Sequence, residues 1–216
     1  MGHLFLPLHN YCHQLQAETA HISTARKSKL AQLAEYISDR LQNQQQARVI
    51  VICTHNSRRS HLAQLWLAVI ADYLGLLGLE TFSGGTEATA LNPRVVTALR
   101  RVGFEVSTTD AALSNPIYDI RWSADTSGGY RAFSKRYDSA PNPQEAFAAV
   151  MVCNEADEAC PIVSGADVRI ALPFDDPKNY DDTPREADKY LERCRDIGRE
   201  MMYVLEQLRI NDKVSQ

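Results

Sequence analysis

The sequence predicts an α/β fold: an open, mostly parallel sheet of four strands with helices on both faces, preceded by an N-terminal helical extension and interrupted by a β-hairpin insertion. Two observations predict this class. Short apolar runs bounded by turn residues alternate with longer segments of helical periodicity, which is the rhythm of βαβ units. The chain has 216 residues, 44% of them hydrophobic, so it can bury one core without disulfides or metals.

Residues 1–46 are expected to form the helical extension. Apolar positions at i, i+3, i+4, i+7 and i+11 indicate one helix with an apolar face, made by Leu30, Leu33, Ala34, Ile37 and Leu41. This helix either packs on the main domain or acts as a dimerisation arm, so a homodimer stays open. A polar run over residues 42–46 links it to the first strand.

Residues 47–212 are expected to form the main domain. Its four strands are expected at short apolar runs, over residues 49–52, 79–83, 147–152 and 168–172. Helical spacing after the first run ends at Gly75, Asn92-Pro93 opens another helix, and residues 184–208 carry the stripe of a long last helix. Ligands bind such sheets outside the carboxyl ends of the strands, so a site is expected at that edge.

An insertion over about residues 112–145 breaks the βαβ rhythm. Residues 117–122 and 130–137 each alternate apolar and polar side chains, with Ser127-Gly128-Gly129 between them, which predicts a β-hairpin. We expect this hairpin to be either a lid or partner surface, or a solvated edge protected by Lys and Arg.

Composition and charge exclude several classes of function. The formal net charge of −4 gives no global basic field, which argues against general nucleic-acid binding. The first residues lack the basic start of an export signal, and no run approaches the roughly 20 apolar residues of a membrane helix. We therefore expect a cytoplasmic protein without membrane contact. Five cysteines suit thiol chemistry better than a disulfide framework, and no zinc-like cluster occurs; they are Cys12, Cys53, Cys153, Cys160 and Cys194.

The most informative motif is Cys53-x5-Arg59-Ser60, between an apolar strand and a helical segment. A thiol there faces unpaired amides at the positive end of the helix dipole, and these donors stabilise a thiolate. The same amides can surround a tetrahedral oxyanion, while Arg59 donates to two of its oxygens and Ser60 donates to the sulfur. The alternative is a buried cysteine that merely ends a strand. The expected oxyanion-binding residues are Thr54, His55, Asn56, Ser57, Arg58, Arg59 and Ser60.

This motif resembles the phosphate-binding loop of the low-molecular-weight protein tyrosine phosphatase superfamily, Cys-x5-Arg-Ser/Thr. The resemblance covers about residues 48–208 apart from the hairpin, and it implies a phosphotyrosine phosphatase I-like fold. Two enzyme classes share the loop. Phosphatases hydrolyse phosphotyrosine through a cysteinyl phosphate, whereas thioredoxin-coupled arsenate reductases add two redox cysteines. His55 stands where the family usually has Gly, and Gln64 stands where potassium-dependent reductases have Glu, which implies no alkali-metal requirement.

Cys153 and Cys160 follow the third expected strand. In a continuous helix seven residues rise about 10.5 Å, beyond the roughly 7 Å between Cα atoms that a disulfide allows, so the two can bond only if the segment bends or unwinds. Cys-x6-Cys-Pro at this place is similar to the thioredoxin-coupled arsenate reductases, which implies a redox-active pair. The alternative is two small thiols packed under a helix, and Cys194 is expected in the core.

Asp176 lies directly before Pro177, after the fourth strand. In the superfamily an Asp before Pro is the general acid, so the resemblance implies that Asp176 protonates the leaving oxygen. Asp175 is the adjacent alternative, and a turn without chemistry is another. Phosphatases of the superfamily generally place aromatic residues directly after Asp-Pro, whereas the first aromatic residue here is Tyr180, which favours the reductase.

The leading prediction is an arsenate reductase that binds arsenate or a phosphate-like oxyanion. Cys53, Arg59 and Asp176 would form the catalytic centre, and Cys153 and Cys160 would relay a disulfide to thioredoxin, without metal or tightly bound cofactor. The alternative is a phosphatase that hydrolyses phosphoesters through a Cys53 phosphocysteine. A third class is an oxyanion or redox sensor that binds without turnover.

Overall fold

A four-stranded parallel sheet forms the centre of the fold in the computed structural model, which describes residues 4–125, 129–159 and 162–214. The strand order is β2-β1-β6-β7, and every neighbouring pair is parallel. This confirms the predicted open α/β sheet. The strands are β1 (Ala47–Cys53), β2 (Leu79–Gly85), β6 (Phe147–Met151) and β7 (Ala166–Ala171).

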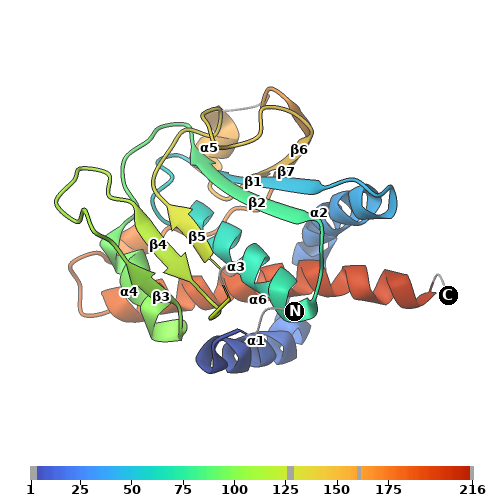
Figure 1. Cartoon of the computed structure of the whole chain (residues 1–216), viewed down its shortest axis with the longest axis horizontal. Coiled ribbons are helices and arrows are strands. Elements are labelled where there is room, and N and C mark those ends of the chain that lie inside the picture. Colours follow the sequence, from blue (N-terminus) through green and yellow to red (C-terminus); the bar gives the residue numbers. More distant parts are fainter. Residues whose placement is uncertain (1–3, 126–128, 160–161, 215–216) are drawn as a thin grey trace.

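The helices stack in layers against this sheet. In Figure 1 the sheet lies above α3 and α6, and α1 lies below α6. The short α5 follows β6 and contacts β1 and β6. The helices are α1 (Leu6–Glu18), α2 (Thr24–Gln42), α3 (Arg59–Leu74), α4 (Pro93–Val102), α5 (Asn154–Ala159) and α6 (Glu186–Val214), with single 3-10 turns at η1 (Thr19–His21) and η2 (Pro177–Tyr180).

The sequence signals for helix ends are confirmed at two places. Gly75 ends α3 in the left-handed conformation, with φ 69°, which glycine adopts without steric cost. Asn92 caps α4 by accepting a hydrogen bond from the Arg94 amide, and Pro93 occupies the first helical position.

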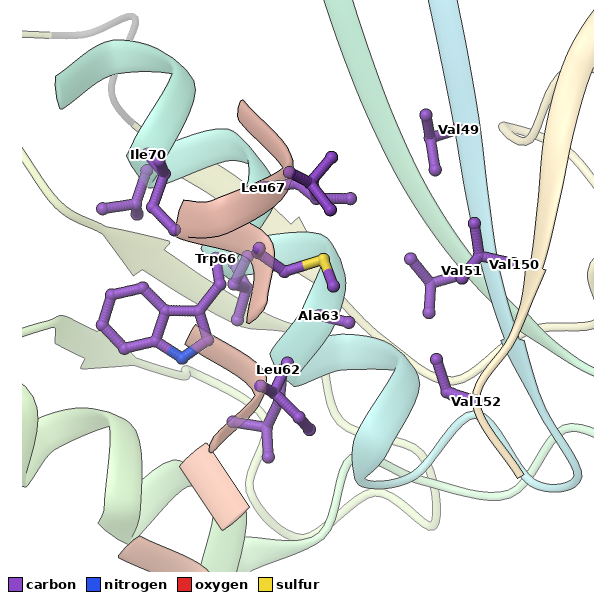
Figure 2. Close-up of a cluster of buried hydrophobic side chains, with 14 of the residues drawn as sticks. Val49, Val51, Leu62, Ala63, Trp66, Leu67, Ile70, Val150 and Val152 are labelled. Carbon is purple, nitrogen blue, oxygen red and sulfur yellow. The ribbon is translucent and has the colours of Figure 1, made fainter. Parts of the chain in front are cut away.

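The core lies on both sides of α3. Figure 2 shows Val51 and Val150 of neighbouring strands pointing toward α3, where Ala63 faces them, while Trp66 points away from the sheet. The strand side chains follow the two-residue period of a pleated strand. Because α3 is covered by the sheet on one side and by α6 on the other, its apolar residues are buried around most of its circumference.

The N-terminal extension packs on its own chain. Leu30, Leu33 and Ile37 of α2 are fully buried, as is Leu15 of α1, and both helices contact α6. The apolar stripe of α2 therefore serves intramolecular packing, as the first of the two interpretations expected.

A second sheet has the order β3-β4-β5, in which β3 (Glu105–Ser107) precedes the insertion, and β4 (Tyr118–Arg121) and β5 (Gly129–Ala132) belong to it. The β4-β5 pair confirms the predicted hairpin, but the predicted extent of its second strand is wrong. That strand stops at Ala132 because the chain turns to pair with the edge of β2: the Gly85 amide donates to Lys135 O (2.9 Å), and the Tyr137 amide donates to Gly85 O (2.9 Å).

The segment after the hairpin, residues 133–137, therefore includes buried positions, which neither a mobile lid nor a solvated edge would have. Ser134 and Lys135 are 2% and 4% exposed, and they lie against β2 and the loop that follows β1.

Within the described residues, none of the helices combines the length and apolar character needed to cross a membrane.

Candidate active site

The loop between β1 and α3, residues 54–58, has every carbonyl group turned outward. Each backbone oxygen from Cys53 to Ser57 accepts a hydrogen bond from outside the loop. The pairs are Thr86 N to Cys53 O (3.1 Å), Glu87 N to Thr54 O (2.8 Å), Ser134 Oγ to His55 O (2.9 Å), His61 Nε2 to Asn56 O (3.0 Å) and Asn92 N to Ser57 O (3.0 Å).

This orientation directs the loop amides to the centre. In a trans peptide the N–H of one residue points opposite to the C=O of the residue before it, so the amides of residues 54–58 face inward. In the described part of the chain, no group accepts a hydrogen bond from these five amides. Such a ring of donors at a helix N-terminus binds a tetrahedral anion.

Asn56 holds the loop in its tight shape. It is fully buried and has φ 44°, a left-handed conformation that Asn tolerates better than most residues. Its Nδ2 donates to Ser60 Oγ (2.9 Å), and its Oδ1 accepts from the Lys135 amide (2.9 Å). The strained position of the loop is therefore Asn56 and not His55, whose side chain is 46% exposed, within 3.8 Å of Glu87.

Cys53 lies at the floor of this ring and is 4% exposed. Its Sγ is 3.1 Å from Ser60 Oγ. Since Ser60 Oγ already accepts from Asn56 Nδ2, its own proton is left to donate to the sulfur. This contact gives a Cys53 thiolate one side-chain donor in addition to the loop amides.

His61 supports the loop from below and was not singled out from the sequence. It is fully buried, and burial, together with the positive charge of Lys135, lowers its pKa from 6.5 to about 3. The ring is therefore neutral. Nε2 donates to Asn56 O, and Nδ1 accepts from Ser83 Oγ at 3.4 Å. No sequence motif marks this residue, because its role depends on β2 and the insertion.

Arg59 reaches across the loop to the segment after β7. Its Nη1 donates to Phe174 O (2.8 Å), and its Nη2 donates to Asp176 Oδ2 (2.7 Å). Arg59 is 7% exposed, and its Nε finds no hydrogen-bond partner among the described residues. An unpaired buried donor costs free energy, which an oxyanion in the loop would recover.

Asp176 is the carboxylate that faces the loop. Its Oδ1 also accepts from the Lys178 amide (3.0 Å), so it caps η2. The alternative, Asp175, has a side chain that is 94% exposed and lies 3.6 Å from Arg193. Of the two adjacent acids, only Asp176 is in contact with Arg59.

Arg58, one of the expected oxyanion-binding residues, has its guanidinium bound by residues from the C-terminal part of the chain. Its Nε donates to Tyr190 Oη (2.8 Å), and its Nη2 donates to Asp181 Oδ2 (3.2 Å). Because these partners engage the guanidinium, only the backbone amide of Arg58 is directed to the centre of the loop.

Cys153 lies beside the loop, although it is a hundred positions from Cys53 in the sequence. The strands β1 and β6 are neighbours, and the Val152 amide donates to Ile52 O (2.9 Å), so their ends lie side by side. Cys153 Sγ is 3.5 Å from Thr54 Oγ1. The thiol is fully buried, and this burial raises its pKa, although the Thr54 contact and Arg59 oppose the shift.

The remaining thiols separate into two groups. Cys12 and Cys194 are fully buried, and burial raises the pKa of each to about 12, which confirms Cys194 as a core residue. Cys160 lies outside the described residues, so the predicted Cys153–Cys160 pair is not tested.

The described residues contain no group of three or more His, Cys, Asp or Glu that could hold a metal ion.

Several known proteins are similar to this chain in sequence or in fold. No family model matches the chain. It is 28% identical over 148 residues to an arsenate reductase of Bacillus licheniformis, a match that covers 68% of this chain and 86% of the relative. It is 31% identical over 131 residues to an arsenate reductase of Brevibacillus brevis, which covers 60% of this chain and 75% of the relative.

Solved structures with low sequence identity share the fold. A YwlE mutant from Bacillus subtilis has a TM-score of 0.53 and 17% identity over 76% of this chain and 99% of that chain. A low-molecular-weight phosphotyrosine phosphatase from Vibrio cholerae O395 has a TM-score of 0.50 and 12% identity over 74% and 95%. Since the chain has this fold and spans three quarters of a relative that it matches at 31% identity, it belongs to the arsenate reductase branch of the low-molecular-weight protein tyrosine phosphatase superfamily.

Proposed function

We propose that this enzyme reduces arsenate to arsenite, with Cys53 as the nucleophile and Cys153 as the second thiol. One observation carries the proposal: a second buried thiol lies next to the loop, with Cys153 Sγ 3.5 Å from Thr54 Oγ1. Phosphoester hydrolysis has no need of this thiol, because water completes that reaction. The similarity to relatives named arsenate reductase also supports this proposal.

The first step is attack of the Cys53 thiolate on arsenate. The amides of residues 54–58 and the Arg59 guanidinium bind the oxyanion, as the free donors of the loop favour. A sulfur–arsenic bond forms, and one oxygen leaves as water after Asp176 donates a proton. Arsenic remains in the +5 state in this adduct.

The second step transfers the electrons. The Cys153 thiolate attacks the Cys53 sulfur, the sulfur–arsenic bond breaks, and its electron pair remains on arsenic. Arsenite in the +3 state leaves, and a Cys53–Cys153 disulfide remains. Two electrons thus pass from the two thiols, which are oxidised to a disulfide, to arsenic, which is reduced from +5 to +3.

A relay then restores Cys53. We propose that Cys160 attacks Cys153, which releases the Cys53 thiolate and forms a Cys153–Cys160 disulfide for reduction by thioredoxin. The helix α5, Asn154–Ala159, separates the two cysteines. In a continuous helix the seven residues between them would rise about 10.5 Å, beyond disulfide reach, so we propose that this segment bends or unwinds when the bond forms.

Phosphoester hydrolysis is the second candidate, and one feature favours it. Tyr180 lines a surface pocket of about 170 Å³ together with Pro177 and Asp176, the carboxylate that contacts Arg59. An aromatic ring there could receive the ring of a phosphotyrosine, with Cys53, Arg59 and Asp176 in the same roles and water as the second nucleophile.

The deciding experiment is an arsenate-dependent NADPH oxidation assay with bacterial thioredoxin and thioredoxin reductase. The proposal predicts steady oxidation and one arsenite for each NADPH. Rapid hydrolysis of p-nitrophenyl phosphate with no arsenate-dependent oxidation would instead establish the phosphatase. Binding of phosphate without either turnover would establish a sensor.

A further inference from the structure

We propose that Arg26, in the N-terminal extension, is a positioning residue that sets the location of Arg59 through Phe174. The inference rests on the proposed role of Arg59 as the oxyanion clamp. It gives the extension a part in the active site, beyond its packing on α6.

Arg26 is itself held firmly. It lies in the first turn of α2, where its amide donates to the N-cap oxygen Ser23 Oγ (3.3 Å). Its Nε donates to both oxygens of Glu200 on α6 (3.0 and 2.9 Å), and Nη2 lies 2.8 Å from Glu200 Oε2. Glu200 is 9% exposed, so this pair is shielded from solvent on the carboxylate side.

The guanidinium of Arg26 stacks on the Phe174 ring. The Arg26 Cζ lies 4.8 Å from the ring centroid, within the range of a cation–π contact. Phe174 is 7% exposed, so the ring has little freedom to move once Arg26 covers it.

Phe174 belongs to the segment that holds Arg59. Its carbonyl accepts from Arg59 Nη1 (2.8 Å), and two residues later Asp176 accepts from Arg59 Nη2 (2.7 Å). Pro173 and Pro177 fix the backbone angle φ at the two ends of this segment. The Phe174 amide also donates to Val152 O (3.1 Å), so the sheet holds one side of this backbone. We infer that loosening the Phe174 ring loosens both acceptors of Arg59 on the other side.

A second ion pair docks the same extension without touching this segment. Arg195 on α6 pairs with Glu18 of α1, and its guanidinium lies 5.6 Å from the Tyr11 ring. It provides a matched control, because loss of Arg195 removes an extension contact of the same kind. If Arg26 only docked the extension, the two substitutions would have equal effects on the site.

The test measures oxyanion binding without turnover. Cys53 is alkylated with iodoacetamide at increasing inorganic phosphate, and modification of the Cys53 peptide is followed by mass spectrometry. The four proteins are the wild type, Arg26→Met, Arg26→Lys and the control Arg195→Met. Thermal unfolding of each variant verifies folding.

We expect phosphate to protect wild-type Cys53. Arg26→Met should raise the phosphate concentration for half-protection about tenfold, since the cation–π contact and the Glu200 pair are both lost. Arg26→Lys should stay within about threefold of wild type, because a Lys ammonium can still lie on the ring. Arg195→Met should match wild type. Without phosphate, the alkylation rate should be the same in all four, because the loop around Cys53 is unchanged.

Equal half-protection in Arg26→Met and wild type would overturn the positioning role, and so would an equal loss in Arg195→Met. Absence of protection in wild type is a different result. It would remove the oxyanion loop itself, and with it both the proposed function and this inference.

Discussion

Two neighbouring strand ends carry the same local pattern and differ in what surrounds them. β1 ends in Cys53 and β6 is followed by Cys153, and a helix comes after each. Cys53 is followed by a loop whose carbonyl groups are all bonded outward. Cys153 is followed directly by the six-residue α5, and it is fully buried.

The difference shows that tertiary partners decide what a strand-end thiol can do. Donors from the segment after β2, from the N-cap of α4 and from the insertion turn the loop amides toward Cys53, which suits an anion and a thiolate. Around Cys153 the described residues provide the Thr54 hydroxyl at 3.5 Å and a backbone hydrogen bond from Ala156, while burial raises the pKa of its thiol. Burial therefore disfavours the thiolate of Cys153 relative to a solvent-exposed thiol.

Replacing each of the two thiols in turn should give the largest difference in activity between the two strand ends. Cys53→Ser should lower both arsenate reduction and p-nitrophenyl phosphate hydrolysis by at least about 10³-fold, because the nucleophile is lost. Cys153→Ser should abolish arsenite release and leave phosphoester hydrolysis within about threefold. Steady-state rates with both substrates check this. Arsenate turnover by Cys153→Ser would show that the second strand end has no redox role.

A methyl group at Gly85 should damage the Cys53 end alone. A Cβ at Gly85 would lie 2.6 Å from Thr54 O and 2.7 Å from Asn56 N, both backbone atoms that cannot move aside. We expect Gly85→Ala to cost about 2 kcal/mol of unfolding free energy and to weaken phosphate protection of Cys53. Gly129→Ala is the control, because its closest contact is 3.3 Å from Ile120 O. Equal behaviour of the two variants in denaturant titrations would contradict this.

The buried His61 under the Cys53 loop should make stability depend on pH. Its pKa falls from 6.5 to about 3 on folding, so its contribution is complete above pH 6.5 and is lost as pH falls toward 3. Between pH 6.5 and 4.5 the wild type should lose about 2 to 3 kcal/mol more stability than His61→Gln, at about 1.4 kcal/mol per pH unit. Urea titrations at several pH values measure this. Parallel curves for the two proteins would mean that folding does not lower the pKa of His61.

The smallest effect is expected at the Cys153 end. Arg169 on β7 pairs with Asp157 of α5. Arg169→Ala should loosen α5 and raise the alkylation rate of Cys153 about threefold, as an ion pair of this exposure contributes at most about 1 kcal/mol. Arg131→Ala removes a pair of the hairpin instead and is the control. An unchanged Cys153 rate would show that α5 opens without breaking this pair.

Much of the fold and the loop could be predicted from local sequence. Apolar runs mark all four strands of the main sheet, and Gly75 and Asn92 mark helix ends correctly. These signals are short-range, so one sequence contains them. Cys53, Arg59 and Asp176 could be assigned together because their motifs resemble a family, and the structure brings them into one site.

The bracing contacts could not be predicted, because they join distant segments. Lys135 and Ser134 reach the loop from nearly eighty positions away, and alternation suggested that these residues continued the hairpin. From the sequence alone, His61 is not distinguishable from the other residues of an amphipathic helix. The partners of the Arg58 guanidinium, Tyr190 and Asp181, likewise lie more than a hundred positions away.

The central claim is that Cys53 and Cys153 bond to each other when arsenate is reduced. The most direct measurement uses Cys160→Ser, which stops the relay after that step, followed by alkylation and peptide mapping of protein treated with arsenate. We expect one arsenite per enzyme and a Cys53–Cys153 disulfide. Free, alkylated Cys53 and Cys153 after arsenate treatment, with no arsenite formed, would contradict the account.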